Sequence, residues 1–144
     1  MIKRLISAMV TLIFAISLMG CNGQKMAKDK IFAIVEKNYD AIVTACENKD
    51  AESLLKIDGI TKVDIVDGYV LVYCMGAGIA PSSQDYGFYY SEENRPIGVF
   101  DGYKVCDFEE MTQDGNGYTF VDEWSNSFYT EHIRGNIYFY SNAL

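Results

Sequence analysis

The first reactive side chain to consider is the thiol of Cys21, which follows Gly20 at the end of an apolar leader. Lys3 and Arg4 give the chain a positively charged start, and Leu5–Met19 follow without a charged residue. This order is typical of a secretory leader. As a helix, the apolar run would be about 22 Å long, shorter than the roughly 30 Å hydrocarbon core that a transmembrane helix crosses. The sequence therefore favours a removable leader that places a thiol at its cleavage point.

The segment Leu18–Cys21 resembles the lipobox of bacterial lipoproteins. The resemblance implies that Cys21 receives a diacylglycerol, that residues 1–20 are removed as a lipoprotein signal peptide, and that the new amino terminus is acylated. Two or three acyl chains anchor a protein stably because each buried CH₂ contributes about 0.8 kcal/mol, whereas one chain binds only marginally. The alternative is an ordinary secretory leader with a cysteine near its cleavage site, and the sequence leaves it open.

The same resemblance predicts location and domain organisation. The protein is expected to be lipid-anchored in the cell membrane or outer membrane, with the membrane as its partner through the anchor, and to face outside the cytoplasm. Residues 21–27 are predicted to form a flexible polar linker that begins at the lipidated Cys21. Residues 28–144 are long enough for one domain with its own core.

The predicted mature chain is acidic, and its charge is unevenly distributed. The whole sequence has 12 basic and 20 acidic residues. Removal of residues 1–20 takes away two basic and no acidic residues, which leaves 10 basic against 20 acidic groups and a net charge of −10. Residues 63–144 hold thirteen acidic groups and only Arg95, Lys104 and Arg134 as basic ones. Such a surface disfavours nucleic acid and favours a protein partner with a basic surface, although solubility is the simpler explanation.

Beyond Cys21, the sequence predicts no catalytic, cofactor or metal site. His132 is the single histidine, and Glu131 beside it in a predicted strand points to the opposite face, so the two cannot act as an acid and histidine pair. A hydrogen-bonded structural role is expected for His132. Asp114–Gly117 begins like a calcium loop, but later ligand positions lack acidic residues, so a hairpin turn is expected. Adjacent acidic residues are expected to lie in solvent-exposed turns and need no catalytic role. They are Glu92-Glu93, Glu109-Glu110 and Asp122-Glu123.

Three further cysteines lie in the predicted domain. Cys46 falls on the apolar face of a predicted helix, which suits a small buried side chain. Cys74 and Cys106 fall in predicted strands and could form a disulfide in an oxidising, exported environment. Three thiols leave one unpaired, so the free state also stays open.

The hydrophobic pattern predicts helices first and strands afterwards. From Lys28 to Glu47 apolar residues recur every three or four positions, which indicates an amphipathic helix with one buried face. Asp50 can cap a second, shorter helix that ends at Asp58-Gly59. The predicted buried stripe of the first helix is Phe32, Val35, Tyr39, Ile42 and Cys46.

After Gly59 the apolar period becomes two, which is typical of strands. Asp67-Gly68 and Arg134–Asn136 suit hairpin turns, and a loop is predicted from Gly76 to Gln84. The fold class is therefore α+β, with two N-terminal helices packed on a meandering antiparallel β-sheet. The predicted strands are Val63–Ile65, Tyr69–Met75, Tyr86–Tyr90, Ile97–Phe100, Tyr103–Phe108, Tyr118–Val121, Phe128–Ile133 and Ile137–Tyr140.

The segment Tyr73–Pro96, together with Tyr129–Ile133 and Ile137–Tyr140, resembles a group of small exported proteins of Firmicutes without an established activity. The resemblance implies export and assigns no catalytic residue. We therefore expect a non-catalytic domain that binds a protein through its aromatic and acidic sheet or through the region from Gly76 to Asp85. The alternatives are an immunity or inhibitor protein against a basic toxin or enzyme, and a scaffold for envelope assembly.

Overall fold

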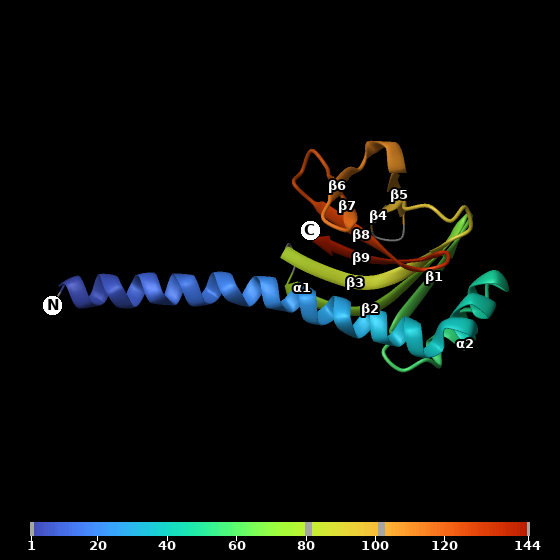
Figure 1. Ribbon diagram of the computed structural model, residues 1–144, viewed down its shortest axis with the longest axis horizontal. Coiled ribbons are helices and arrows are strands. Elements are labelled where there is room, and N and C mark those ends of the chain that lie inside the picture. The colour runs from blue at the N-terminus through green and yellow to red at the C-terminus, as the bar shows by residue number, and fades with distance from the viewer. Residues whose placement is uncertain (1, 80–81, 101–102, 144) are drawn as a thin grey trace.

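The structure is a computed structural model with one α-helical and one β-sheet layer as its main parts. Figure 1 shows a long helix lying across one face of a large antiparallel sheet, while a small two-stranded sheet lies over the other face. The predicted α+β class is confirmed. The backbone is described for residues 2–79, 82–100 and 103–143, and the side chains for residues 23–76, 83–99 and 104–143.

The two predicted helices differ greatly in length. The first, α1 (Ile2–Glu47), is the only long helix in the described part of the chain. The second, α2 (Ala51–Leu55), is a five-residue helix. Asp50 caps it as predicted, because its carboxylate accepts hydrogen bonds from the Ser53 N–H at 3.1 Å and from the Ser53 hydroxyl at 2.6 Å. The single turn is enough to place Leu54 in the core.

The helix α1 packs on the sheet over a longer stretch than the sequence predicts. Residues 23–27, predicted as a linker, are helical, and Ala27 is only 4% exposed. Gln24 Nε2 donates a hydrogen bond at 3.3 Å to Ser141 Oγ on the sheet. Packing of one face stabilises a helix more than intrinsic propensity does, which accounts for the helical state of residues 23–27. All five residues of the predicted stripe are buried or half-buried: Phe32, Val35, Tyr39, Ile42 and Cys46.

The large sheet has seven antiparallel strands in the order β1-β2-β3-β9-β8-β7-β6. Two runs of consecutive strands, β1 to β3 and β6 to β9, meet where β3 pairs with β9, so the predicted meander is interrupted once. The bounds are β1 (Lys62–Val66), β2 (Tyr69–Ile79), β3 (Ser82–Ser91), β6 (Thr112–Asp114), β7 (Gly117–Val121), β8 (Ser127–Arg134) and β9 (Ile137–Ala143).

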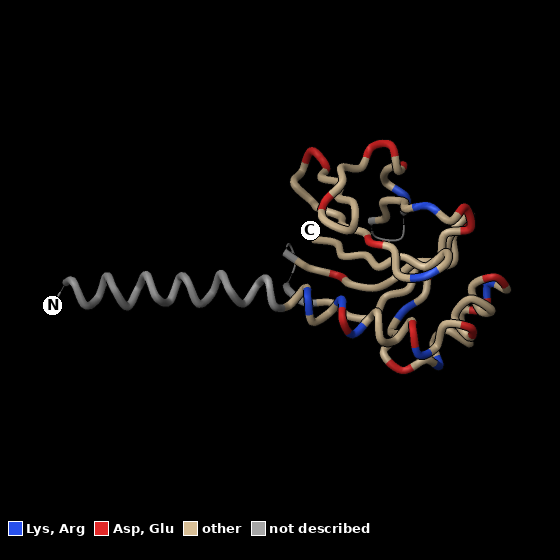
Figure 2. The backbone as a smooth tube through the Cα atoms, in the orientation of Figure 1, with Lys and Arg blue, Asp and Glu red and all other residues tan. Residues whose placement is uncertain are grey.

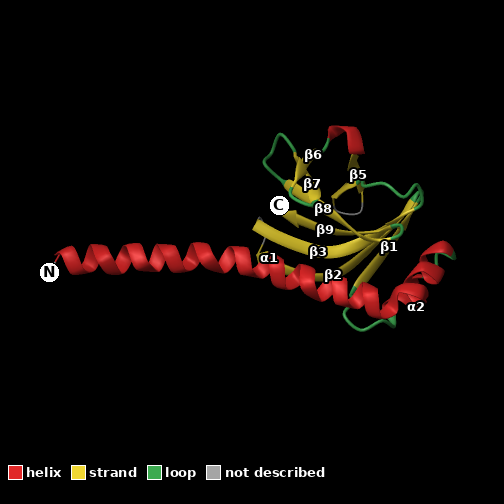
Figure 3. Ribbon diagram, viewed as in Figure 1, coloured by secondary structure: helices red, strands yellow, loops and turns green. Residues whose placement is uncertain are grey.

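The chain between β3 and β6 forms a separate small sheet. It consists of β4 (Gly98–Phe100) and β5 (Tyr103–Cys106), which pair with each other and are followed by a 3₁₀ turn, η1 (Phe108–Glu110). Figure 3 shows these short elements above the large sheet, on the side away from α1. The small sheet thereby covers apolar side chains that would otherwise face water.

Because successive side chains of a strand point to opposite sides, buried residues lie on both faces of the large sheet. We call the cluster between α1 and the sheet the helix-side core, and the cluster beneath β4 and β5 the far-side core. The helix-side core includes Ile31, Val35, Ile42, Leu54, Val70, Val72, Cys74, Phe88, Ile137 and Phe139. The far-side core consists of Tyr69, Leu71, Tyr89, Ile97, Val99, Phe128, Tyr138 and Tyr140.

The segment predicted as a loop between Gly76 and Gln84 is paired backbone. Gly76 pairs with Asp85, and β2 continues to Ile79 before β3 begins at Ser82. The loop prediction is wrong because glycine is depleted in strands generally, whereas here it permits a close approach: a Cβ on Gly76 would lie 2.7 Å from Asp85 Oδ1. The described residues of this region therefore belong to paired strands and not to the expected loop. Residues 80 and 81 lie outside the described residues.

Candidate binding cleft

The two ends of the large sheet carry different structures. At one end Gln24 contacts Ser141. The last pairs there are Val121–Ser127 of β7 and β8, Ser127–Ala143 of β8 and β9, and Gln84–Ala143 of β3 and β9. At the other end three turns meet, since the Ser91 N–H donates to Asn136 O at 2.9 Å and the Glu92 N–H donates to Gly68 O at 3.0 Å. We call these the Gln24 end and the Asp67 end of the sheet.

A polar cleft of about 370 Å³ lies at the Asp67 end, on the side of the small sheet. Its lining residues come from the β1–β2 turn, the β3–β4 turn and β5, and the carboxylates of η1 lie beside it. Figure 2 shows the acidic turns of this region as red segments. We call the whole site the acidic cleft; its charged residues are Asp67, Glu92, Glu93, Arg95, Lys104, Asp107, Glu109 and Glu110.

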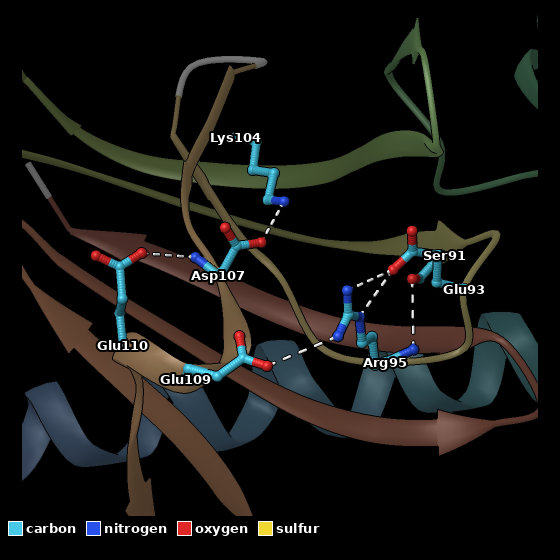
Figure 4. A network of polar contacts seen from close by, with 7 residues as sticks. All are labelled: Ser91, Glu93, Arg95, Lys104, Asp107, Glu109 and Glu110. Atoms are coloured by element: carbon cyan, nitrogen blue, oxygen red, sulfur yellow. Dashed lines mark hydrogen bonds and ion pairs between the residues drawn. The ribbon is translucent and has the colours of Figure 1, made fainter.

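Both cations of the acidic cleft are paired with carboxylates, as Figure 4 shows. Arg95 donates from Nε to Glu93 Oε2 at 2.8 Å, and its Nη1 lies 3.7 Å from Glu109 Oε1. Lys104 forms an ion pair with Asp107. Six carboxylates against these two cations give a formal charge of −4, or −3 when Lys49, which lies 3.5 Å from Glu92 Oε1, is included. Arg95 thus joins the β3–β4 turn to η1, while the cleft keeps an excess of negative charge.

The turn η1 holds two of the carboxylates in fixed positions. The Asp107 N–H donates a hydrogen bond at 2.9 Å to Glu110 Oε2, which is the back-reaching half of a capping box. The hydrogen bond from Lys104 to the Asp107 carboxylate lowers the pKa of Asp107. Asp107 therefore presents a negative charge at neutral pH, close to the carboxylate of Glu110.

The side chains that line the acidic cleft are mostly charged or polar. No histidine or cysteine is among the described residues that line it. Tyr69 is 3% exposed, and burial raises its pKa. Charge is therefore the chemistry that the cleft offers.

Cys46 is buried, as the sequence predicts, and no disulfide joins the described cysteines. Cys46, Cys74 and Cys106 are free and buried. Cys74 belongs to the helix-side core, whereas Cys106 lies on β5 over the other face, so the sheet separates the two thiols. The possible Cys74–Cys106 disulfide is therefore not formed in this structure, which has the free state that the sequence left open. Cys21, the predicted lipidation site, lies within the backbone range of α1, and its side chain is outside the described side chains.

The structural role expected of His132 is confirmed. Its Nε2 lies 2.8 Å from Gly135 O in the β8–β9 turn, and its ring packs edge-on against Tyr138 at 5.1 Å between centroids. Glu131 points to the opposite face, where it pairs with Lys28 of α1. The two neighbours therefore do not interact as an acid and histidine pair.

Sequence reasoning missed one exposed aromatic residue. Most described strand tyrosines are buried in the two cores, and the others, Tyr73, Tyr118 and Tyr129, are half-buried. Trp124 is 77% exposed instead, in the loop between β7 and β8. Its signal in the sequence was its position: the only tryptophan of the chain lies between two polar pairs in a turn.

Two further kinds of site are absent from the described residues. No group of three or more His, Cys, Asp and Glu side chains is placed to hold a metal ion, and none of the helices in this part of the chain is long and apolar enough to cross a membrane. Asp114 and Gly117 close the β6–β7 hairpin, as expected for a turn. Comparison with protein-family models, curated proteins and solved structures finds no match for this chain.

Proposed function

We propose that this chain is a lipid-anchored, non-catalytic protein displayed outside the cytoplasmic membrane, and that it binds a protein with a basic surface at the acidic cleft. The observation that carries the proposal is the gathering of six carboxylates at the Asp67 end of the sheet. Cys21 precedes Gln24 by three residues, about 4.5 Å along a helix. A lipid anchor at Cys21 would therefore hold the opposite end of the sheet and leave the acidic cleft directed away from the membrane.

The charge balance favours a cationic partner over an anionic one. Arg95 and Lys104 already have carboxylate partners, so neither is an unoccupied site for an anion. These ion pairs are about half exposed, and exposed pairs contribute only about 0–1 kcal/mol each. Lysine and arginine side chains of a partner can therefore replace Arg95 and Lys104 in these ion pairs at little cost in free energy. The excess negative charge also accelerates encounter with a basic surface.

Two kinds of partner are consistent with this site. An immunity or inhibitor protein would cover a basic toxin or enzyme, whereas an envelope scaffold would bind a resident component of the cell surface. Both would present a basic surface to the acidic cleft. The identity of the captured protein therefore distinguishes them.

The anchor is tested by metabolic labelling. Cells that express the full chain are given a labelled fatty acid, and we expect the label to enter the wild type and to be absent from Cys21→Ala. Label that persists in Cys21→Ala would exclude Cys21 as the acylated residue. A wild type without label would exclude the lipoprotein assignment as a whole.

The acidic cleft is tested by cross-linking the full protein in its membrane before solubilisation in detergent. The double variant Asp67→Asn/Glu92→Gln removes two charges, and the introduced asparagine is a residue type that suits the turn before Gly68. We expect capture of the partner to fall about tenfold, equivalent to about 1.4 kcal/mol. The matched control Asp40→Asn/Glu47→Gln removes two exposed charges from α1 and should capture as the wild type does. Equal losses in both variants would contradict a role for the acidic cleft.

A further inference from the structure

Trp124 lies at the tip of a loop that hydrogen bonds hold in one conformation. Asp122 Oδ1 accepts from the N–H groups of Trp124 and Asn126, each at 2.9 Å, and Asp122 Oδ2 accepts from Asn126 Nδ2 at 2.9 Å. The Asp122 N–H donates to Asn126 O at 3.0 Å, and Ser125 adopts a positive φ of 67°. The exposed indole is thus presented by a preorganised loop.

This loop projects from the Gln24 end of the sheet. Val121 and Ser127 form the last pair between β7 and β8, and Ser127 also pairs with Ala143 of β9. Gln24 and Ser127 line the same polar pocket of about 210 Å³. The loop therefore continues past the last pair at the end where the anchored segment enters the domain.

The contacts between α1 and the sheet also place the N-terminal part of α1 at the Gln24 end. Arg134, at the Asp67 end, pairs with Glu36 at 3.3 Å, whereas Ser141, near the Gln24 end, contacts Gln24. The sheet residues reached by α1 thus move toward Ala143 as the helix is followed toward its N-terminus. Residue 21, one helical turn before Gln24, belongs at the end of the sheet that carries Trp124.

Two more exposed apolar side chains lie on this part of the molecule. Val121, which begins the Trp124 loop, is 58% exposed, and Met26, one helical turn after Asn22 on α1, is 69% exposed. We propose that Trp124 contacts the interfacial headgroup region of the membrane that holds the Cys21 anchor. The proposal rests on the lipid anchor put forward above, and it adds a second contact that orients the domain.

The chemistry of the site favours lipid as the occupant of this surface. Tryptophan is enriched at membrane interfaces because its ring is apolar and its N–H is polar. A tether at the same end raises the effective concentration of lipid at the loop, so a weak contact becomes populated. The neighbouring Asp122 and Glu123 disfavour anionic lipids, which makes a zwitterionic surface the matching one.

The single tryptophan permits a direct test. The full lipidated protein is reconstituted into phosphatidylcholine vesicles with brominated acyl chains, which quench only an indole in contact with lipid. We expect Trp124 emission to fall to less than half of its value in vesicles of the same lipid without bromine. The control Trp124→Phe/Leu55→Trp moves the only indole to α2, at a site that is 48% exposed, and should keep its emission in brominated vesicles.

Each outcome of this experiment has one meaning. Protein that floats with the vesicles while Trp124 stays unquenched would overturn the proposal and leave the anchor intact. Equal quenching of Trp124 and of the Leu55→Trp control would overturn it too, because the contact would not be specific to one end. If Trp124 stays unquenched in brominated vesicles and becomes buried only when the protein captured by cross-linking is added, the Trp124 loop contacts protein and the proposal is wrong. Protein that fails to float would contradict both the anchor and the orientation that depends on it.

Discussion

Lys28 of α1 and Glu131 of β8 form an ion pair across the helix-side core, although 103 positions separate them in the chain. The Glu131 side chain is 10% exposed, and the Tyr129 hydroxyl donates to the same carboxylate oxygen at 2.6 Å. Two donors from different elements therefore converge on one buried charge. The ion pair fixes the position of α1, and with it the place where the predicted anchor enters the domain.

Removing the lysine is expected to destabilise the protein. In Lys28→Met the Glu131 carboxylate loses its cation while it stays largely buried, and fully buried cases cost about 3–5 kcal/mol. Because the Lys28 side chain is 30% exposed, we expect a loss of about 2 kcal/mol in the free energy of unfolding. Urea denaturation measures it. Lys28→Arg should retain most of the stability, and a Lys28→Met protein as stable as the wild type would show that solvent already screens the charge.

The early start of the packed helix leads to a second prediction. Ala27 is 4% exposed, so Ala27→Asp would bury a carboxylate that lacks a partner, and we expect a loss of at least about 2 kcal/mol in stability. Met26 is the adjacent residue and is 69% exposed. Met26→Asp should change the stability by less than about 0.5 kcal/mol. If residues 23–27 were a free linker in solution, the two variants would unfold at the same urea concentration.

The parts of the fold that local chemistry determines could be predicted from the sequence. Gly68 and Gly135 take positive φ values of 84° and 53° in the two expected hairpin turns, and Asp50 caps α2 as expected. The pairing of β3 with β9 could not be predicted in this way. Forty-five residues separate the bonded positions Ser91 and Asn136, and period-two alternation says which face a side chain takes but not which strand lies beside it.

The candidate site was predictable only in its composition. The adjacent carboxylates at Glu92-Glu93 and Glu109-Glu110 are visible in the sequence, where they predict solvated turns. Their gathering depends on Arg95, which joins the two turns through Glu93 and Glu109. That contact follows from the placement of the small sheet over the far-side core, which no local pattern encodes.

The buried thiols should be unreactive in the folded protein. Burial raises the pKa of both Cys46 and Cys74 to about 12, and that of Cys106 to about 11. Almost no thiolate is present at pH 8, and we expect iodoacetamide to modify these three positions only after urea is added. Mass spectrometry of the peptides reports each site separately. A Cys74–Cys106 peptide pair that resists alkylation until a reductant is added would contradict the free thiols.

The same thiols give stability a pH dependence. Each folded pKa lies above the unfolded value of 9.0, so the folded state binds more protons in alkaline solution. The contribution is complete below pH 9 and is lost as the pH rises toward 11 to 12. We expect the urea midpoint to fall between pH 8 and pH 10, and to fall less in Cys46→Ala at the same pH values. An unchanged midpoint would mean that the thiols titrate equally in both states.

Gly87 is a position at which the sheet has no room for a side chain. It pairs with Tyr73 on one neighbouring strand and with Tyr140 on the other, and a Cβ there would lie 1.9 Å from the Val72 carbonyl oxygen and 2.9 Å from the Tyr140 hydroxyl oxygen. The tyrosine could rotate away, but a backbone carbonyl within the ladder cannot move without breaking a strand pair. We therefore expect Gly87→Ala to cost about 3 kcal/mol in unfolding free energy.

The control is Gly23→Ala, where the added Cβ meets open space on α1. It should be neutral or stabilising by up to about 1 kcal/mol. Equal urea midpoints for the two variants would mean that β2 and β3 are not in the register described, because only this register brings the Val72 carbonyl against residue 87.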